Sequence, residues 1–332
     1  MLFKKLLILS SALALIFFMA CSEDSSTEPT PKVNEFKLLA DVGDDYFTTY
    51  KTAGGLDVNL GMAALFPLLT DMDTGNDPYI IDYRSAADYN YKHIIGAVNM
   101  PLADLITAVN AGTIPMDKTI VNVCYTGQTA SVATAVLNLL GYEAQNLSFG
   151  MCGVTTDTNV VKKTTTWVSQ TAADEYTLNK VAVPAPTTEY TLPTLSTGAK
   201  NADDVIKERF TAALTWSVSF NNVIANPTDY FIVNYWAATD YNDIGHIDGA
   251  YQFTPKESLE QDQMLKYLPT NKKIAVYCWT GQTSAQVVPY LRMLGYDAYS
   301  LTFGVNGFAY FQIPAGKPRY SAPTSDFSSV LE

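Results

Sequence analysis

The sequence predicts an α/β protein made of two copies of one domain, each a parallel sheet with helices on both faces. A hexapeptide, Cys124–Thr129, recurs 154 residues later as Cys278–Thr283. The 27 residues 124–150 align without gaps on 278–304, with 13 identities. Runs rich in Val, Ile and Tyr alternate with helical patterns, which is typical of parallel sheets. Because such a repeat defines the architecture, the 332 residues hold two domains plus ends.

The composition and the repeat divide the chain into six segments. They are residues 1–20, a signal peptide; 21–34, a disordered tether; 35–155, the first domain; 156–200, a Thr- and Pro-rich linker or extension; 201–323, the second domain; and 324–332, a tail. Within the extension, Val160–Val168 is a candidate for strands that cover the first domain.

The first segment carries the features of an export signal. Lys4 and Lys5 precede an apolar run, Leu6–Ala20, that is too short for a comfortable membrane span. The run ends at Cys21, and the pattern resembles a bacterial lipoprotein signal, in which that cysteine becomes lipidated. An ordinary signal peptide that ends near a cysteine is the alternative. The sequence therefore predicts a protein of the bacterial cell envelope, lipid-anchored to the membrane through Cys21 and facing the periplasm or the surface.

Charge and cysteine content exclude several classes of function. Without residues 1–20, 19 basic and 33 acidic residues leave a formal charge of −14, which argues against a nucleic-acid partner. Besides Cys21, only Cys124, Cys152 and Cys278 remain, an odd number without the spacing of a disulfide scaffold. The sequence has no Cys-x-x-Cys motif and no His cluster, so no metal and no other cofactor is expected. The oligomeric state stays open.

Each copy presents the same order of elements. An opening helix is followed by a strand, a turn and helix, the strand that leads into the cysteine, a further helix and a last strand. The expected strands are 79–83, 119–123 and 143–148 in the first copy and 230–235, 273–277 and 297–302 in the second.

The helix after each cysteine has its own signals. After Cys124, the apolar residues are spaced for one buried face and the helix stops at Gly141. Thr129 and Thr283 stand where each helix begins and are candidate N-caps. In the second copy Pro289 removes a backbone hydrogen bond, which predicts a kinked and less regular helix.

The two repeated cysteines lie in a tight turn between a strand and a helix N-terminus. Backbone N–H groups and the helix dipole favour negative charge there, so a thiolate forms easily. Gly127 and Gly281 can adopt a positive φ and let consecutive N–H groups converge on one point. A buried structural cysteine is the alternative, since that is a common state of this residue type. The recurrence of the whole turn favours a functional site, more strongly for Cys124 than for Cys278.

Motifs on both sides of the cysteine resemble those of the rhodanese family. The loop has the form Cys-x-x-Gly-x-Thr, and the accompanying motifs are 81–84, 88–89, 93–97 and 147–150 in the first copy and 240–241, 246–250 and 301–304 in the second. The upstream marker, the cysteine loop and the closing strand with its glycine are three motifs that occur in this order in both copies. Together they are a specific signal. The resemblance implies two tandem rhodanese-like domains, each a doubly wound parallel sheet with helices on both faces.

The resemblance also implies sulfurtransferase chemistry. A cysteine thiolate attacks the sulfane sulfur of a small anionic donor such as thiosulfate, holds it as a persulfide and passes it to a thiol or cyanide-like acceptor. Cys124 and Cys278 are then the catalytic residues, with Asp82 and Arg84 in support. The substrate-binding loops consist of Tyr125, Thr126, Gly127, Gln128 and Thr129 and of Trp279, Thr280, Gly281, Gln282 and Thr283. A ring of backbone N–H groups stabilises an anionic persulfide without a dedicated base.

Two other cysteine chemistries are disfavoured by the residues present. A Cys–His hydrolase needs a histidine base, but the two histidines, His93 and His246, sit in a His-Ile-x-Gly-Ala turn that they are expected to hold. A phosphatase of this fold needs an arginine at the sixth position after the cysteine to clamp phosphoryl oxygens. Ala130 and Ser284 occupy those positions instead.

The second copy departs from the family pattern. Asn234 and Trp236 stand where the first copy has Asp82 and Arg84. Losing both charges together avoids an uncompensated buried charge, which costs roughly 3–5 kcal/mol. We therefore expect Cys124 to be the principal persulfide carrier.

The loops themselves lack the cation that family loops often carry. Tyr125 and Trp279 stand where Arg or Gly is common, and they form either an apolar mouth or a packing contact. The missing cation and the negative net charge, which repels a thiosulfate dianion, keep a second function open. That alternative is a non-catalytic sulfane-sulfur carrier or a redox-sensing binding module. A purely structural role with inert cysteines comes third.

Cys152 occurs only in the first copy, where it follows Gly150; Asn306 matches it in the second. The end of the last strand should lie beside the cysteine strand at the carboxyl edge of the sheet, near Cys124. In an oxidising compartment, Cys152 could then resolve an oxidised or persulfidated Cys124 through a reversible disulfide. A small buried apolar residue is the alternative.

Overall fold

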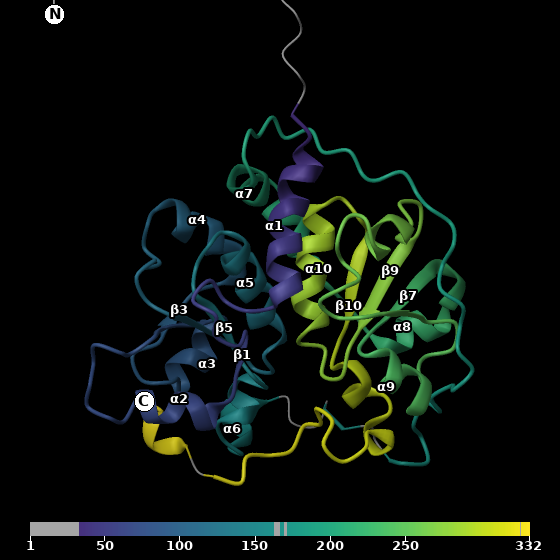
Figure 1. The fold of residues 1–332 in the computed structure, drawn as a ribbon. Helices are drawn as coiled ribbons and strands as arrows, with labels where there is room; N and C mark the ends of the chain where they lie inside the picture. Colours follow the sequence, from purple (N-terminus) through teal and green to yellow (C-terminus); the bar gives the residue numbers. More distant parts are fainter. Residues whose placement is uncertain (1–32, 163–166, 169–170, 326) are drawn as a thin grey trace, which may run out of the picture. The chain divides into compact units, whose positions relative to one another are not determined.

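The computed structural model describes residues 33–162, 167–168, 171–325 and 327–332 and contains two five-stranded sheets (Figure 1). Their strand orders are β1-β5-β4-β2-β3 and β6-β10-β9-β7-β8, so the second sheet repeats the topology of the first. Every strand pair in both sheets is parallel. The predicted fold class, two tandem α/β domains with parallel sheets, is confirmed.

Each of the six runs predicted from the sequence contains a strand of the structure. The strand bounds are β1 Asn59–Leu60, β2 Tyr79–Asp82, β3 Val98–Asn99, β4 Ile120–Val123 and β5 Ala144–Leu147 in the first domain, and β6 Ser217–Val218, β7 Tyr230–Tyr235, β8 Tyr251–Phe253, β9 Lys273–Tyr277 and β10 Ala298–Leu301 in the second. All four residues of β4 are buried, as expected for a central strand with both faces covered.

Helices cover the sheets and connect their strands. The α-helices are α1 Glu35–Thr49, α2 Met62–Leu68, α3 Ala86–Tyr91, α4 Leu105–Asn110, α5 Gln128–Leu139, α6 Thr158–Val161, α7 Ala202–Ala213, α8 Phe220–Ala225, α9 Ala238–Asp243 and α10 Ser284–Met293. Short 3-10 helices are η1 Leu102–Asp104, η2 Gly150–Gly153, η4 Pro227–Asp229, η5 Met264–Tyr267, η6 Gly304–Gly307, η7 Tyr310–Gln312 and η8 Ser328–Val330.

The helices that follow the two cysteines pack against each other. The prediction of one buried face for α5 is wrong, because nearly all of its residues are buried. Its own strands β4 and β5 cover one side, and α10, α1 and α7 contact it as well. Helix α10 runs as one helix across Pro289 and spans 10 residues, against 12 in α5. The two helices therefore form the central contact between the domains.

The predicted threonine caps are not formed. Gly127 is the N-cap of α5, so Thr129 lies within the first turn. Thr283 is the N-cap of α10 by position, but its side chain makes no capping hydrogen bond. The physical reason in the first domain is that the backbone N–H groups at the start of α5 face the sulfur of Cys124 instead.

The stretch predicted to add strands over the first domain starts as a helix. Val160 and Val161 belong to α6, which begins after Asp157, whose side chain accepts a hydrogen bond of 2.9 Å from the Asn159 N–H. This side-chain cap favours a helical turn over a strand, so the strand prediction is wrong for these residues. Residues 163–166 lie outside the described part of the chain.

The segments that follow the two domains each pair with the other domain. Asn179, in the extension after the first domain, forms an antiparallel bridge with His246, with both N–H···O bonds at 2.8 Å. Leu331, in the tail after the second domain, forms the equivalent bridge with Ile94. Figure 1 shows the C-terminus beside α2 and α3 of the first domain. The linker and the tail thus tie the two domains together.

The predicted signal peptide and Cys21 lie outside the described residues. Within the part of the chain that the structure describes, no helix is long and apolar enough to cross a membrane. Export and lipid anchoring stay predictions.

Candidate active site

Each repeated cysteine lies at the end of a buried strand, directly before a helix. Cys124 follows β4 and is 2 % exposed, and its sulfur accepts a hydrogen bond of 3.4 Å from the Ala130 N–H. Cys278 follows β9 and is also 2 % exposed, with the Ser284 N–H at 3.4 Å from its sulfur. Gly127 and Gly281 have φ of +76° and +74°, as the loop pattern predicts. The two loops therefore have the same geometry.

Four backbone N–H groups of the first loop favour the anionic form of the Cys124 sulfur. They belong to Ala130, Thr126, Gly127 and Thr129. Burial nevertheless has the larger effect and raises the pKa of the Cys124 thiol above its ordinary value. The expectation of a low thiol pKa is therefore wrong for Cys124, because the helix N-terminus lies in a fully buried environment.

The loop is held from behind by the turn that follows the last strand. The Met151 N–H donates to the Cys124 carbonyl at 2.9 Å, and the Cys152 N–H donates to the Tyr125 carbonyl at 3.1 Å. A Cβ atom on Gly150 would clash with the Cys124 carbonyl oxygen and would lie 2.7 Å from the Gly127 nitrogen. Only glycine permits this approach, which explains the closing glycine of the motif.

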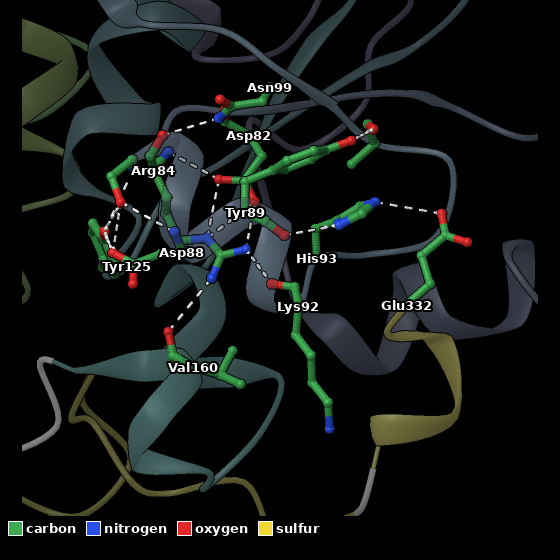
Figure 2. Close-up of polar contacts among 12 residues, drawn as sticks. Asp82, Arg84, Asp88, Tyr89, Lys92, His93, Asn99, Tyr125, Val160 and Glu332 are labelled. Atoms are coloured by element: carbon green, nitrogen blue, oxygen red, sulfur yellow. Dashed lines mark hydrogen bonds and ion pairs between the residues drawn. The ribbon is translucent and has the colours of Figure 1, made fainter.

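In the first domain, Asp82 and Arg84 form a buried ion pair next to the loop (Figure 2). The Arg84 Nη2 lies 2.7 Å from Asp82 Oδ2, and both side chains are at most 1 % exposed. The guanidinium also donates to the carbonyl oxygens of Lys92, at 2.7 Å, and Val160, at 3.4 Å. Its centre lies 5.9 Å from the centroid of the Tyr125 ring. Arg84 therefore braces the elements around the loop, and its hydrogen bonds go to Asp82 and to backbone carbonyls.

In the second domain, aromatic packing fills the same place. Trp236 packs against Trp279, with ring centroids 4.0 Å apart and ring planes tilted by 34°, and contacts Tyr277 edge-on. Asn234 donates from Nδ2 to the Tyr277 hydroxyl at 2.9 Å. Of the two alternatives for the loop aromatic, the packing contact describes Trp279. The paired loss of both charges is consistent with the energetics of buried ion pairs.

A lysine from outside the loop lies near Tyr125 in the first domain. We call the position of Tyr125 and Asp88, with its equivalent at Trp279 and Asp240, the mouth of each site. Lys162 forms an ion pair with Asp88, and the Tyr125 hydroxyl donates to the same carboxylate. The hydrogen bond from Lys162, followed by that from Tyr125, holds the pKa of Asp88 well below its usual range. Tyr125 is thus tethered by its hydroxyl, and the mouth is more polar than the sequence suggested.

The second site has an equivalent cation. Lys317 Nζ lies 2.6 Å from Asp240 Oδ1 and 6.0 Å from the centroid of the Trp279 ring. Lys162 and Lys317 were not predicted from the sequence, because neither lies within a cysteine loop. Their signal was a shared position, 12 and 13 residues after the closing glycine of each copy. Each charge is balanced by an aspartate in this structure.

Both histidines hold their turns. His93 Nδ1 donates to the Tyr89 carbonyl at 2.9 Å, and its Nε2 lies 3.5 Å from Glu332 Oε1 (Figure 2). His246 Nδ1 donates to the Ile247 carbonyl at 2.9 Å. Neither contact involves a cysteine, in agreement with the structural role expected for these residues. Among the described residues, no three His, Cys, Asp or Glu side chains come together as a possible metal site.

Cys152 is a buried free thiol, as are Cys124 and Cys278. Burial, as the largest effect, raises the pKa of Cys152 to about 11. The negative charge of an anionic Cys124 contributes a smaller part of this rise, so the two thiols influence each other. A thiol of this pKa is a poor nucleophile at neutral pH, which favours the role of Cys152 as a small buried apolar residue. A reversible disulfide between Cys124 and Cys152 stays a prediction.

The polar side chains of the loops form hydrogen bonds within and between the domains. Thr126 and Thr280 are both 7 % exposed. The Thr126 Oγ1 accepts a hydrogen bond of 3.0 Å from Gln128 Nε2. The carboxamide oxygens of Gln128 and Gln282 each accept hydrogen bonds from the other domain. The sequence placed these glutamines in their own substrate loops, and the structure shows contacts that link the two loops.

A buried indole joins the two sites. Trp167 contacts Phe149 and Phe303 edge-on, with ring centroids 5.2 Å and 5.1 Å apart. It also stacks on Tyr320, at 5.2 Å. Phe149 and Phe303 each precede a closing glycine, so one side chain from the extension packs against both closing turns.

Comparison with known families finds the same domain twice in the chain. The model of the rhodanese-like domain matches twice, at residues 67–156 and 226–310. No curated protein matches the chain. The chain is similar to the thiosulfate sulfurtransferase of Pseudomonas aeruginosa, with 13% identity over 86% of this chain and 49% of that chain and a TM-score of 0.30.

Shorter stretches are similar to two further solved structures. A full-length protein from Lactobacillus plantarum is 28% identical over 34% of this chain and 89% of that chain, with a TM-score of 0.25. Reduced CoADR-RHD from Bacillus anthracis is 28% identical over a stretch that covers 28% of this chain and 16% of that chain, with a TM-score of 0.24.

Proposed function

The chain belongs to the family of rhodanese-like domains, and we propose that it is a sulfurtransferase that carries sulfane sulfur as a persulfide on Cys124 and, in the second domain, on Cys278. The observation that most supports this role is the position of each cysteine sulfur at the start of a helix, 3.4 Å from the backbone N–H of Ala130 or Ser284. The terminal sulfur of a persulfide is an anion, and preorganised donors stabilise it without rearrangement.

The proposed reaction has two displacement steps. The thiolate of Cys124, its proton having passed to solvent, attacks the outer sulfur of a donor such as thiosulfate. A new S–S bond forms, the donor S–S bond breaks, and sulfite leaves with the electron pair. An acceptor thiolate or cyanide then attacks the terminal sulfur, and the Cys124 thiolate leaves. Sulfur moves from donor to acceptor, and the protein is unchanged after the cycle.

The test is the intact mass of the purified protein after incubation with thiosulfate. We expect one or two added sulfurs, removable with cyanide. Cys124→Ser and Cys278→Ser assign each addition to its site, and a Cys152→Ser variant serves as the matched thiol control. No added sulfur with thiosulfate or with an organic persulfide donor would contradict the proposal.

A second candidate function is a sulfane-sulfur carrier or redox-sensing module with little turnover. Both thiols are only 2 % exposed, and Lys162 and Lys317 are already paired with aspartates. These observations favour slow entry of an anionic donor. If a stable persulfide forms but the protein does not complete several turnovers with cyanide, the carrier or sensing function is the correct one.

We also propose that the protein is exported and anchored to the membrane by lipid on Cys21. Support comes from Lys4 and Lys5, the apolar run that follows and the polar tether. Cys21→Ala should release the protein from the membrane fraction or block its processing. An unaltered protein recovered in soluble form with another N-terminus would contradict the anchor.

A further inference from the structure

Two buried glutamines cross between the domains in a reciprocal arrangement. The Oε1 atom of Gln282 accepts hydrogen bonds from the Phe149 N–H and from Asn146 Nδ2, both at 3.0 Å. The Oε1 atom of Gln128 accepts a hydrogen bond of 2.7 Å from the Phe303 N–H. Gln128 and Gln282 are 3 % and 4 % exposed, so water does not compete for these acceptors.

The bonded residues have an unfavourable backbone conformation. Phe149 and Phe303 have φ of +62° and +63°, a region in which a bulky residue is strained. Such a conformation persists only where the surroundings hold it. The carboxamide of the opposite glutamine supplies that support at the N–H of each phenylalanine.

The phenylalanine turn in turn holds the cysteine loop. Two residues after Gly150, the Cys152 N–H donates to the Tyr125 carbonyl at 3.1 Å. A peptide unit is planar, so fixing the Tyr125 carbonyl also fixes the direction of the Thr126 N–H. That N–H is one of the groups that favour an anionic Cys124. Gln282 is therefore linked to the backbone N–H groups around the Cys124 sulfur through a short series of hydrogen bonds.

The second domain repeats this series. The Val305 N–H donates to the Cys278 carbonyl, and the Asn306 N–H donates to the Trp279 carbonyl, both at 3.1 Å. A Cβ atom on Gly304 would lie 2.7 Å from the Gly281 nitrogen, so the closing turn and the loop are in direct contact. Gln128 is therefore linked to the Cys278 loop through the same series of backbone contacts, although it lacks a counterpart of the bond from Asn146 to Gln282.

We propose that Gln282 and Gln128 are positioning residues that act across the domain boundary, each orienting the cysteine loop of the other domain. The significance of this for sulfur transfer rests on the proposed function above. Neither domain then has a fully organised loop on its own, because each lacks the acceptor that its closing turn requires.

The test compares the alkylation of the two cysteines in Gln282→Met and Gln128→Met. Methionine keeps the volume and removes the acceptor oxygen. The rate of iodoacetamide labelling of each cysteine is measured by peptide mass spectrometry across a pH series. The readout is the midpoint, the pH at which the labelling rate reaches half of its plateau. This midpoint reports how well the thiolate is stabilised, whereas a change in access to the cysteine alters only the plateau rate. We expect Gln282→Met to raise the midpoint of Cys124 by roughly 0.4–1 pH unit, the effect of about one hydrogen bond, and to leave Cys278 unchanged.

Gln128→Met is the reciprocal variant and should shift Cys278 more than Cys124, whose own loop loses only the hydrogen bond from Gln128 Nε2 to Thr126 Oγ1. A shift confined to the cysteine of the mutated loop, an equal shift of both cysteines, or no shift would each overturn the proposal. Circular dichroism checks folding; should a methionine variant not fold, Gln282→Asn, whose carboxamide is one methylene shorter, carries the same test. Alkylation needs no sulfur donor, so this result is independent of whether the protein transfers sulfur.

Discussion

The two domains share a topology and a loop geometry but differ in what braces the loop. In the first domain a buried Asp82–Arg84 ion pair ties β2 to the Lys92 and Val160 carbonyls. In the second, Trp236 packs on Trp279 at the same place. The φ of the loop glycine differs by only 2° between the copies, at +76° and +74°. The fold therefore accepts either a charged network or an aromatic packing contact, provided that both partners of the charged pair are replaced together.

What the two copies keep in common is more informative about function. Both retain the closing turn with an aromatic residue at positive φ, and both place a lysine–aspartate pair at the mouth. The backbone of the loop, the closing turn and the lysine–aspartate pair are shared, whereas the side chains that brace the loop differ. The differences should therefore change the stability and the charge of each site more than its basic geometry.

The largest expected effect is the loss of sulfur transfer in Cys124→Ser. The first domain keeps the ion pair and the polar Tyr125–Asp88 contact, so we expect Cys124 to carry most of the activity and Cys278→Ser to lose little. Thiosulfate:cyanide assays of both single variants and the double variant measure this. The opposite ranking, with Cys278→Ser inactive and Cys124→Ser active, would reverse the assignment.

The next effect concerns stability. Arg84→Met leaves Asp82 as an uncompensated buried charge and should destabilise the first domain by roughly 3–5 kcal/mol. The double variant Asp82→Asn with Arg84→Trp copies the second domain and should recover much of that loss. Urea unfolding followed by circular dichroism gives both values. A double variant no more stable than Arg84→Met would show that the two bracing arrangements cannot be exchanged.

The pH dependence of loading should follow the thiol of Cys124. Its pKa in the folded protein is raised above the ordinary value of 9.0, so only about 1% or less is thiolate at pH 7. Loading should increase about tenfold per pH unit up to pH 9 and continue to rise beyond it. The stability that accompanies the raised pKa is complete below pH 9.0 and is lost as pH rises through the folded value. A loading rate that levels off near pH 7 would contradict this.

The smallest effect concerns the two mouth lysines. Asp88→Asn frees Lys162 and should lower the KM for an anionic donor by about 1.5- to 5-fold, since the pair is exposed and screened. Asp240→Asn frees Lys317 and should act in the same direction on transfer through Cys278, measured in a Cys124→Ser background. Added salt should reduce both effects. An unchanged KM in Asp88→Asn would exclude Lys162 from donor attraction.

The parts of the fold and of the site that could be predicted are those encoded by patterns within short stretches of the sequence. The repeat, the strand runs and the glycine at the fourth loop position are encoded within short stretches, and the strands β4 and β9 and the positive φ of Gly127 and Gly281 follow from them. The N-cap prediction for Thr129 was wrong because the N–H groups at the start of α5 face the sulfur of Cys124. The prediction of a single buried face for α5 was wrong because α10, α1 and α7 contact this helix in addition to its own sheet.

The sequence by itself determined the two-domain α/β architecture and the position of each cysteine between a strand and a helix, because self-similarity and periodicity are properties of the chain alone. Tertiary structure decided three features of the site. Burial outweighs the loop N–H groups and raises the pKa of Cys124, Lys162 and Lys317 supply the mouth cations, and Gln128 and Gln282 support opposite loops. Desolvation depends on all surrounding atoms, and the other contacts join residues far apart in the chain, so neither could be read from a local pattern.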